Sequence, residues 1–78
     1  MTVEVTVLLN TPEKISQFVN DVRDELYDVD LVSGRYVIDA KSILGIYTLN
    51  IAKPVKAVLH TSEKEATVLL EKMKAYQV

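Results

Sequence analysis

Near the start of the chain, every second position is a branched apolar residue. Valine or leucine occupies positions 3, 5, 7 and 9, and this period of two predicts a strand with one buried face. Thr11 and Pro12 follow the run. A threonine N-cap with proline at the first helical position is a typical helix start, because an N–H at that position has no partner within the helix. We therefore expect a strand followed directly by a helix.

The segment after Pro12 has the period of an amphipathic helix. Its polar residues, including Glu13, Lys14 and Asp21, fall on one side. Its apolar residues recur at spacings of three and four and form a single stripe. The stripe predicts a first helix that buries Ile15, Phe18, Val19, Val22 and Leu26.

Two short runs then have the character of paired strands. Asp28–Val32 is partly β-branched, and Arg35–Asp39 returns to alternation. Ser33-Gly34 lies between them and is a two-residue turn signal. We expect a β-hairpin with this pair as its turn.

The middle of the chain predicts a short apolar helix over Ser42–Leu49. Ser42 stands where an N-cap would stand, directly before an apolar run. Ile46 is assigned to the core together with Leu49. Ile43 and Leu44 have no obvious internal partner, so they are expected to form an exposed patch beside the cap.

The last part of the chain predicts one more strand and one more helix. Asn50 is expected to end the preceding helix with a positive φ, which asparagine tolerates better than most residues. Val55–His60 alternates as a short strand. Ser62 and Glu65 have the spacing of a capping box. The helix that they open is expected to turn one face to the core: Ala66, Leu69, Leu70, Met73 and Tyr76.

The element order is therefore β, α, β, β, α, β, α in a single domain of residues 1–78. Four half-buried strands with all helices available to one face predict an α+β fold, a two-layer open-faced sandwich. The other face of the sheet is expected to be partly solvated.

Composition narrows the possible functions. The formal charge is −2 from 9 basic and 11 acidic residues, so we expect neither a nucleic acid nor a membrane partner. The chain has no cysteine, which excludes a thiolate nucleophile and a cysteine zinc site. No leader pattern or membrane-spanning run is present, so a cytoplasmic location is expected.

The remaining polar residues do not form a recognisable catalytic pattern. His60 is the only histidine, and with no orienting partner in view it is expected neither to act as a nucleophile nor to build a metal site. Gly34 and Gly45 are too few for a phosphate-binding loop. No nucleophile, base and orienting group can be assembled, so an enzyme is not expected. A group of acidic residues is expected to form a solvated helix face and turn: Asp21, Asp24, Glu25, Asp28 and Asp30.

The element order and three short motifs resemble HPr, the small phosphocarrier of the bacterial phosphoenolpyruvate-dependent sugar phosphotransferase system. The matching residues are Ala40-Lys41-Ser42-Ile43-Leu44, Thr48-Leu49 and Gln17-Phe18-Val19. The resemblance covers essentially the whole chain. It implies an antiparallel sheet with the strand order 1-4-2-3 and helices on one face.

The resemblance also implies what this chain has lost. HPr carries a histidine at the start of its first helix, which accepts phosphate from enzyme I and passes it to sugar-specific partners. Counted back from Phe18, that position is Thr11, the neighbouring arginine position is Glu13 and the proline position is Lys14. A hydroxyl forms a stable ester rather than a labile phosphoramidate, and Glu13 places a negative charge where a cation is needed. The chain therefore resembles a degenerate member without phosphohistidine carrier activity.

In Gram-positive relatives the serine that matches Ser42 is phosphorylated by a dedicated kinase. By resemblance Ser42 is either a regulatory phosphoserine or only an N-cap. The same resemblance implies a partner-binding surface of Gln17, Arg23, Ile43 and Leu44. We expect a non-catalytic, protein-binding regulator of the phosphotransferase system. Its partner would be a phosphotransferase component, an HPr kinase or a transcription regulator, and no cofactor is involved. The alternative is an HPr-fold accessory or small-molecule-binding domain with no phosphotransferase role.

Overall fold

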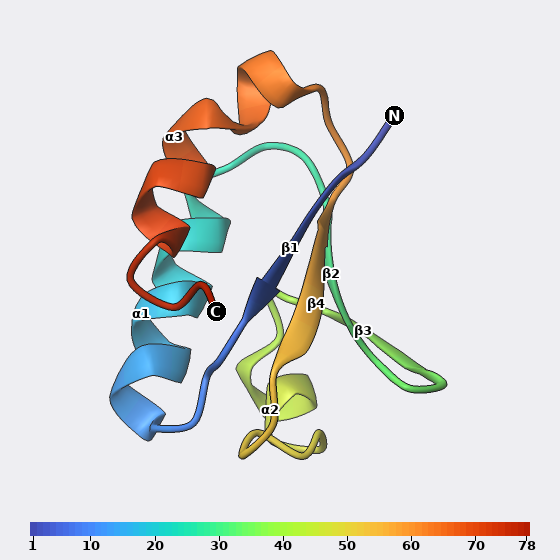
Figure 1. Ribbon diagram of the computed structural model, residues 1–78, viewed down its shortest axis with the longest axis vertical. Coiled ribbons are helices and arrows are strands. Elements are labelled where there is room, and N and C mark those ends of the chain that lie inside the picture. The colour runs from blue at the N-terminus through green and yellow to red at the C-terminus, as the bar shows by residue number, and fades with distance from the viewer.

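The computed structural model describes all 78 residues and shows a twisted sheet covered on one face by helices (Figure 1). The elements are β1 (Val3–Val7), α1 (Pro12–Arg23), β2 (Val29–Ser33), β3 (Tyr36–Asp39), α2 (Ile43–Ile46), β4 (Val55–Leu59) and α3 (Glu63–Met73). The four strands are antiparallel and lie in the order β1-β4-β2-β3. The expected fold class, element order and strand order are confirmed.

The strand register gives each face of the sheet its own character. One row of neighbouring residues crosses all four strands: Glu4 pairs with Val58, Val58 with Asp30, and Asp30 with Asp39. Because side chains alternate along a strand, this row lies on one face. The rows between belong to the other face, where Leu31 and its neighbours are buried. The helices cover that apolar face and leave the polar one open.

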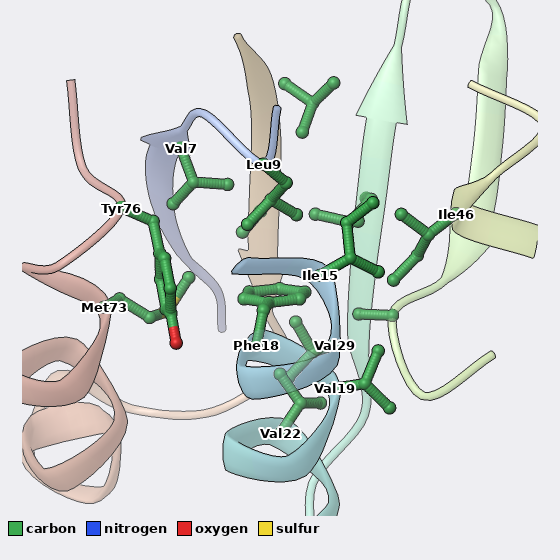
Figure 2. Packing of buried hydrophobic residues seen from close by; sticks show 14 of the residues in the cluster. Val7, Leu9, Ile15, Phe18, Val19, Val22, Val29, Ile46, Met73 and Tyr76 are labelled. Atoms are coloured by element: carbon green, nitrogen blue, oxygen red, sulfur yellow. The ribbon is translucent and has the colours of Figure 1, made fainter. Parts of the chain in front are cut away.

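Phe18 of α1 lies near the centre of the core between the sheet and α3 (Figure 2). Its ring meets the ring of Tyr76 edge to face, with centroids 6.0 Å apart and planes at 86°. Such pairs add about 0.5–1.5 kcal/mol to the stabilisation from burial. The tyrosine hydroxyl donates to the Asp21 carboxylate at 3.0 Å. This contact ties the end of the chain to α1.

The start of α1 is as predicted, but its end is not. Thr11 Oγ1 accepts a hydrogen bond from the Lys14 N–H at 3.2 Å, as an N-cap does. The helix ends at Arg23, and Leu26 is fully exposed rather than buried. The N–H of Glu25 bonds to the Val22 carbonyl, which tightens the last turn and directs the chain toward β2. Leu26 therefore leaves the apolar stripe that its spacing had predicted.

The hairpin turn is shifted by one residue from the expected pair. Ser33 pairs with Tyr36, so Gly34 and Arg35 form the two-residue turn. Gly34 has φ of +59°, a conformation that glycine adopts without a steric penalty. A positive φ at the first central position is the requirement of a type II′ turn.

The structure corrects three expectations around α2. The helix is one turn long rather than eight residues. Ile43 packs against the core and is only partly exposed, whereas Leu44 is exposed as expected. No residue other than glycine has a positive φ. Asn50 instead accepts a hydrogen bond from the Ala52 N–H through its side chain, at 3.3 Å.

The last helix is capped as predicted only in part. Ser62 Oγ accepts from the Glu65 N–H at 3.3 Å, but the Glu65 carboxylate accepts from the Thr61 hydroxyl at 3.0 Å and not from the Ser62 backbone. β4 ends at Leu59, one residue before the expected His60. Of the five predicted core residues in and after α3, only Leu70 is not fully buried.

Candidate functional site

The sequence predictions concentrate on α2 and on the serine before it. Ser42 is exposed, and its Oγ accepts a hydrogen bond from the Gly45 N–H at 3.2 Å. Thr48 Oγ1 donates to the Gly45 carbonyl at 2.6 Å. A Cβ at position 45 would lie 3.2 Å from Ser42 Oγ, closer than most such contacts. Glycine at this position therefore lets the serine hydroxyl close the helix turn.

Two large apolar side chains project from this turn into solvent. Leu44 is 80% exposed and Tyr47 is 47% exposed. Ile46, on the opposite side of the helix, is buried and points toward Ile15 of α1 (Figure 2). Ile46 therefore anchors α2 to the core, whereas Leu44 and about half of Tyr47 are open to solvent. We call Ser42, Leu44 and Tyr47 the α2 surface.

The start of α1 is held by polar contacts of its own residues. Besides the N-cap bond at Thr11, Lys14 Nζ donates to Asn10 Oδ1 at 3.2 Å. Glu13 lies in the first turn, where a carboxylate interacts favourably with the helix dipole. This part of the chain therefore offers a capping hydroxyl, a carboxylate and an occupied ammonium group, and no imidazole.

The expected partner surface draws two of its four residues from α1. Gln17 and Arg23 are both exposed on this helix. Arg23 lies in the last turn, six residues after Gln17, which at ~1.5 Å per residue is roughly 9 Å along the helix. Their role in one partner surface with Ile43 and Leu44 stays a prediction.

The only imidazole lies in a different part of the molecule. His60 Nε2 is 2.8 Å from Asp30 Oδ2, at the edge of an open hollow of about 450 Å³ lined by Asp28, Asp30, Asp39 and His60. His60 follows Leu59, which pairs with Val3 at the start of β1. Thr11 follows the opposite end of β1, after Val7. His60 and the N-terminus of α1 therefore lie at opposite ends of the sheet.

Sequence reasoning did not find this hollow. It grouped Asp28 and Asp30 with the acidic residues of α1 and left out Asp39. The hairpin brings Asp30 opposite Asp39. The predicted turn at Ser33-Gly34 is one residue too early, and it gave a strand register in which these two residues are not opposite each other. No cluster of three or more acidic or imidazole side chains has an arrangement that holds a metal ion.

Two tyrosines have strongly perturbed acidity, and neither is at the α2 surface. Burial, with the nearby carboxylates of Glu25 and Glu65, raises the pKa of Tyr27 to about 12. Burial also raises the pKa of Tyr76 well above its usual value, and its hydrogen bond to Asp21 adds to the effect. Perturbed groups often mark functional sites, but burial and neighbouring carboxylates within the fold account for both shifts.

Comparison with known proteins places the fold. No family model matches the chain, and no curated protein matches it. Solved structures that are similar to it over nearly their whole length include two HPr proteins. HPr-C-His from Thermoanaerobacter tengcongensis has 20% identity and a TM-score of 0.74, with 94% of this chain and 92% of that chain covered.

The phosphocarrier protein HPr from Bacillus anthracis has 21% identity and a TM-score of 0.75, with 99% of this chain and 96% of that chain covered. The chain has the HPr fold. At these identities the similarity establishes the architecture, and it agrees with the strand order 1-4-2-3 that the sequence motifs implied. None of the three helices is long and apolar enough to cross a membrane.

Proposed function

We propose that this chain is a non-catalytic, protein-binding regulator related to the sugar phosphotransferase system, acting through the α2 surface. The observation that carries the proposal is the pair of exposed apolar side chains, Leu44 and Tyr47, beside an exposed serine on an HPr fold. Exposed apolar groups close together, with a polar rim, are typical of protein interaction sites. The partner is a phosphotransferase component, an HPr kinase or a transcription regulator.

The start of α1 supports a role without phosphate relay. Relay through a protein side chain needs a nucleophile whose phosphorylated form is labile and a cation that balances the phosphate. Thr11 Oγ1 is engaged as the N-cap, and Glu13 adds a negative charge beside it. His60 lies at the other end of the sheet, bonded to Asp30. The chain therefore has no group at this position that suits transfer.

Ser42 is the proposed site of regulation. Its hydroxyl is exposed, and only the Gly45 N–H engages it. Phosphorylation would add a charge of about −1.5 to −2 next to the exposed Leu44. A partner that docks on the α2 surface would then meet a charged rather than a neutral rim, so its affinity would change.

One pair of reactions tests the proposal. The chain is incubated with purified enzyme I and phosphoenolpyruvate, and separately with purified HPr kinase and ATP, and each product is examined by intact mass. We expect no acid-labile phosphate in the first reaction and a single phosphate in the second. Ser42→Ala should abolish that phosphate, and Ser16→Ala, which changes an exposed serine on α1, should keep it.

Two results would refute parts of this assignment separately. Acid-labile phosphate from enzyme I would show carrier activity. Modification that persists in Ser42→Ala would place the regulatory group elsewhere. For docking, Leu44→Glu should weaken binding of the kinase by about tenfold or more, as loss of a central apolar contact does, whereas Val68→Glu on α3 should not.

A further inference from the structure

The outer side of β3 is an unpaired sheet edge. The Ala40 N–H bonds to the Val29 carbonyl of β2, so residues 36 and 38, which share its parity, also bond inward. Val37 therefore directs its N–H and C=O away from β2, and so does Asp39. The Asp39 carbonyl accepts from the Ser42 N–H at 3.0 Å. The N–H and C=O of Val37 and the N–H of Asp39 are left free.

This edge is short but carries exposed apolar side chains. Tyr36 is 67% exposed and Val37 is 63% exposed. Sheet edges are commonly blocked by proline, lysine or a bulge, and β3 has none of them. The hairpin projects away from the helical layer (Figure 1). At the opposite edge, in contrast, Gln77 pairs with Val7, and the Val78 N–H bonds to the Thr6 carbonyl.

The same strand has an unbalanced negative charge. Asp39 lies directly opposite Asp30 on the open face, and like charges in this position repel. Asp28 adds a third carboxylate to the hollow, and the only imidazole is already bonded to Asp30. Arg35 lies four residues before Asp39 and makes no ion pair within its own chain. An exposed cation and an acidic hollow thus lie at the two ends of one edge strand.

We propose that β3 pairs with β3 of a second copy of this chain, antiparallel and centred on Val37, so that the two sheets join across a two-fold axis. In this register the two Val37 residues exchange both free backbone hydrogen bonds. Arg35 of each copy stands opposite Asp39 of the other. The contact is isologous, so every favourable pair occurs twice.

The side chains match in this register on both faces. Residues 35, 37 and 39 share the open face. Two Arg35–Asp39 pairs therefore flank a central pair of valines, and each arginine enters the acidic hollow of the other copy. On the helical face, the exposed Tyr36 lies opposite Ile38, which is already partly buried against the core. Antiparallel pairing sets outward-directed residues opposite each other, so the neighbouring registers differ from this one by two residues. They would place Arg35 opposite Val37 or Lys41 instead of Asp39, so the sequence favours this register over its neighbours.

The first test measures association. A four-residue edge is smaller than a standard stable interface of about 800 Å² per partner, so we expect dimers at ~1 mM that dissociate toward ~10 µM, detectable by sedimentation equilibrium. Val37→Pro removes the outward donor while the bonds to β2 stay, because proline is tolerated on an edge strand. This variant should be a folded monomer, with folding checked by circular dichroism.

The second test exchanges the charges. Arg35→Glu places a glutamate opposite Asp39, and Asp39→Arg places an arginine opposite Arg35. Each variant alone should be monomeric, and an equimolar mixture should form a heterodimer, because every cross-strand pair then has opposite charges. Lys64→Glu on α3 changes the charge by the same amount away from β3 and should dimerise as the wild type does.

Three results would overturn the proposal. The first is a wild-type chain that stays monomeric at ~1 mM, a concentration that populates any dimer with a Kd of that order or tighter. The second is a dimer that Val37→Pro leaves unchanged, which would place the contact elsewhere. The third is a mixture of the two charge variants that does not associate while the wild type does, which would exclude this register. If Asp39→Arg does not fold, amide shifts of residues 35–39 on dilution of the wild type decide between the same alternatives.

Discussion

Tyr27 and Tyr76 differ in how their hydroxyl groups are satisfied. The Tyr76 hydroxyl donates to Asp21 at 3.0 Å, whereas the Tyr27 hydroxyl is buried with no hydrogen-bond partner. A buried polar group without a partner costs free energy, and a satisfied bond to a charged group stabilises. The two residues thus have opposite effects on the free energy of unfolding.

Phenylalanine at each position tests this difference. Tyr27→Phe removes an unsatisfied hydroxyl and is expected to leave stability unchanged or raise it by up to ~1 kcal/mol. Tyr76→Phe leaves a carboxylate without its donor and should lower stability by about 1–2 kcal/mol. Urea unfolding of both variants measures the difference. A larger loss at Tyr27 than at Tyr76 would contradict the assignment of partners.

The same tyrosines make stability depend on alkaline pH. In the folded chain the pKa of Tyr27 is raised to about 12 and that of Tyr76 is also raised, while in the unfolded chain both are near 10. Above pH 10 the unfolded state therefore binds fewer protons than the folded state, and the free energy of unfolding falls as pH rises. The stabilisation is fully present below pH 10 and is lost toward pH 12 and above.

Unfolding curves between pH 9 and pH 12 measure this effect. Tyr76→Phe should show a shallower decline than the wild type, and the double variant with Tyr27→Phe a shallower one still. Lysines titrate in the same range but are common to all three chains, so the difference between the chains isolates the tyrosines. Identical slopes in the three chains would show that the two hydroxyls are not protected from ionisation by folding.

At the scale of elements, local signals predicted where helices begin better than where they end. The caps at Thr11 and Ser42 are set by short-range chemistry, an oxygen accepting an N–H three residues later. The end of α1 is set by where the chain must turn to reach β2, which the stripe ending in Leu26 does not encode. α2 is likewise shorter than its apolar run predicted, because Ile43 and Ile46 are drawn to the core and the chain then leaves the helix.

Because α2 has only one turn, its cap and its glycine are coupled. Gly45→Ala gains up to ~1 kcal/mol from helix propensity, but the new Cβ meets Ser42 Oγ at 3.2 Å and weakens a cap of about 1 kcal/mol. We expect little net change in the wild type. In a Ser42→Ala background, where no hydroxyl is displaced, the same change should stabilise the chain.

A double-mutant cycle on thermal or urea unfolding measures this coupling, expected at about 1 kcal/mol. Ser62→Ala, which removes the cap of α3, is the matched control and should add independently to Gly45→Ala. Additivity of Ser42→Ala and Gly45→Ala would mean that the hydroxyl and the glycine do not constrain each other.

At the scale of the whole molecule, the order of elements and the alternation within strands were enough to predict a two-layer fold. The strand order was predicted only from the resemblance to HPr, because the residues of a strand do not identify which other strand pairs with it. The acidic hollow was missed for the same reason: Asp30 and Asp39 meet only through a register between strands. Sites that depend on which strands are neighbours are therefore less visible in this sequence than caps and helix faces.

The size of the molecule makes its centre critical. At ~0.05–0.15 kcal/mol per residue, a chain of this length has roughly 4–12 kcal/mol of stability. Phe18 is fully buried and contacts the Tyr76 ring. Phe18→Ala is expected to cost about 3–5 kcal/mol, a large part of the total. This variant should be unfolded or close to it at 37 °C, as measured by circular dichroism and thermal unfolding.

Leu26 supplies the contrast, because its spacing gives it the same predicted role on the same helix face. It is fully exposed, so Leu26→Ala should change the free energy of unfolding by no more than ~0.5 kcal/mol. Comparing the stability losses of Phe18→Ala and Leu26→Ala therefore tests which members of the predicted apolar stripe are packed in the core. A loss at Leu26 comparable to that at Phe18 would mean that α1 continues past Arg23 in solution and buries the whole stripe.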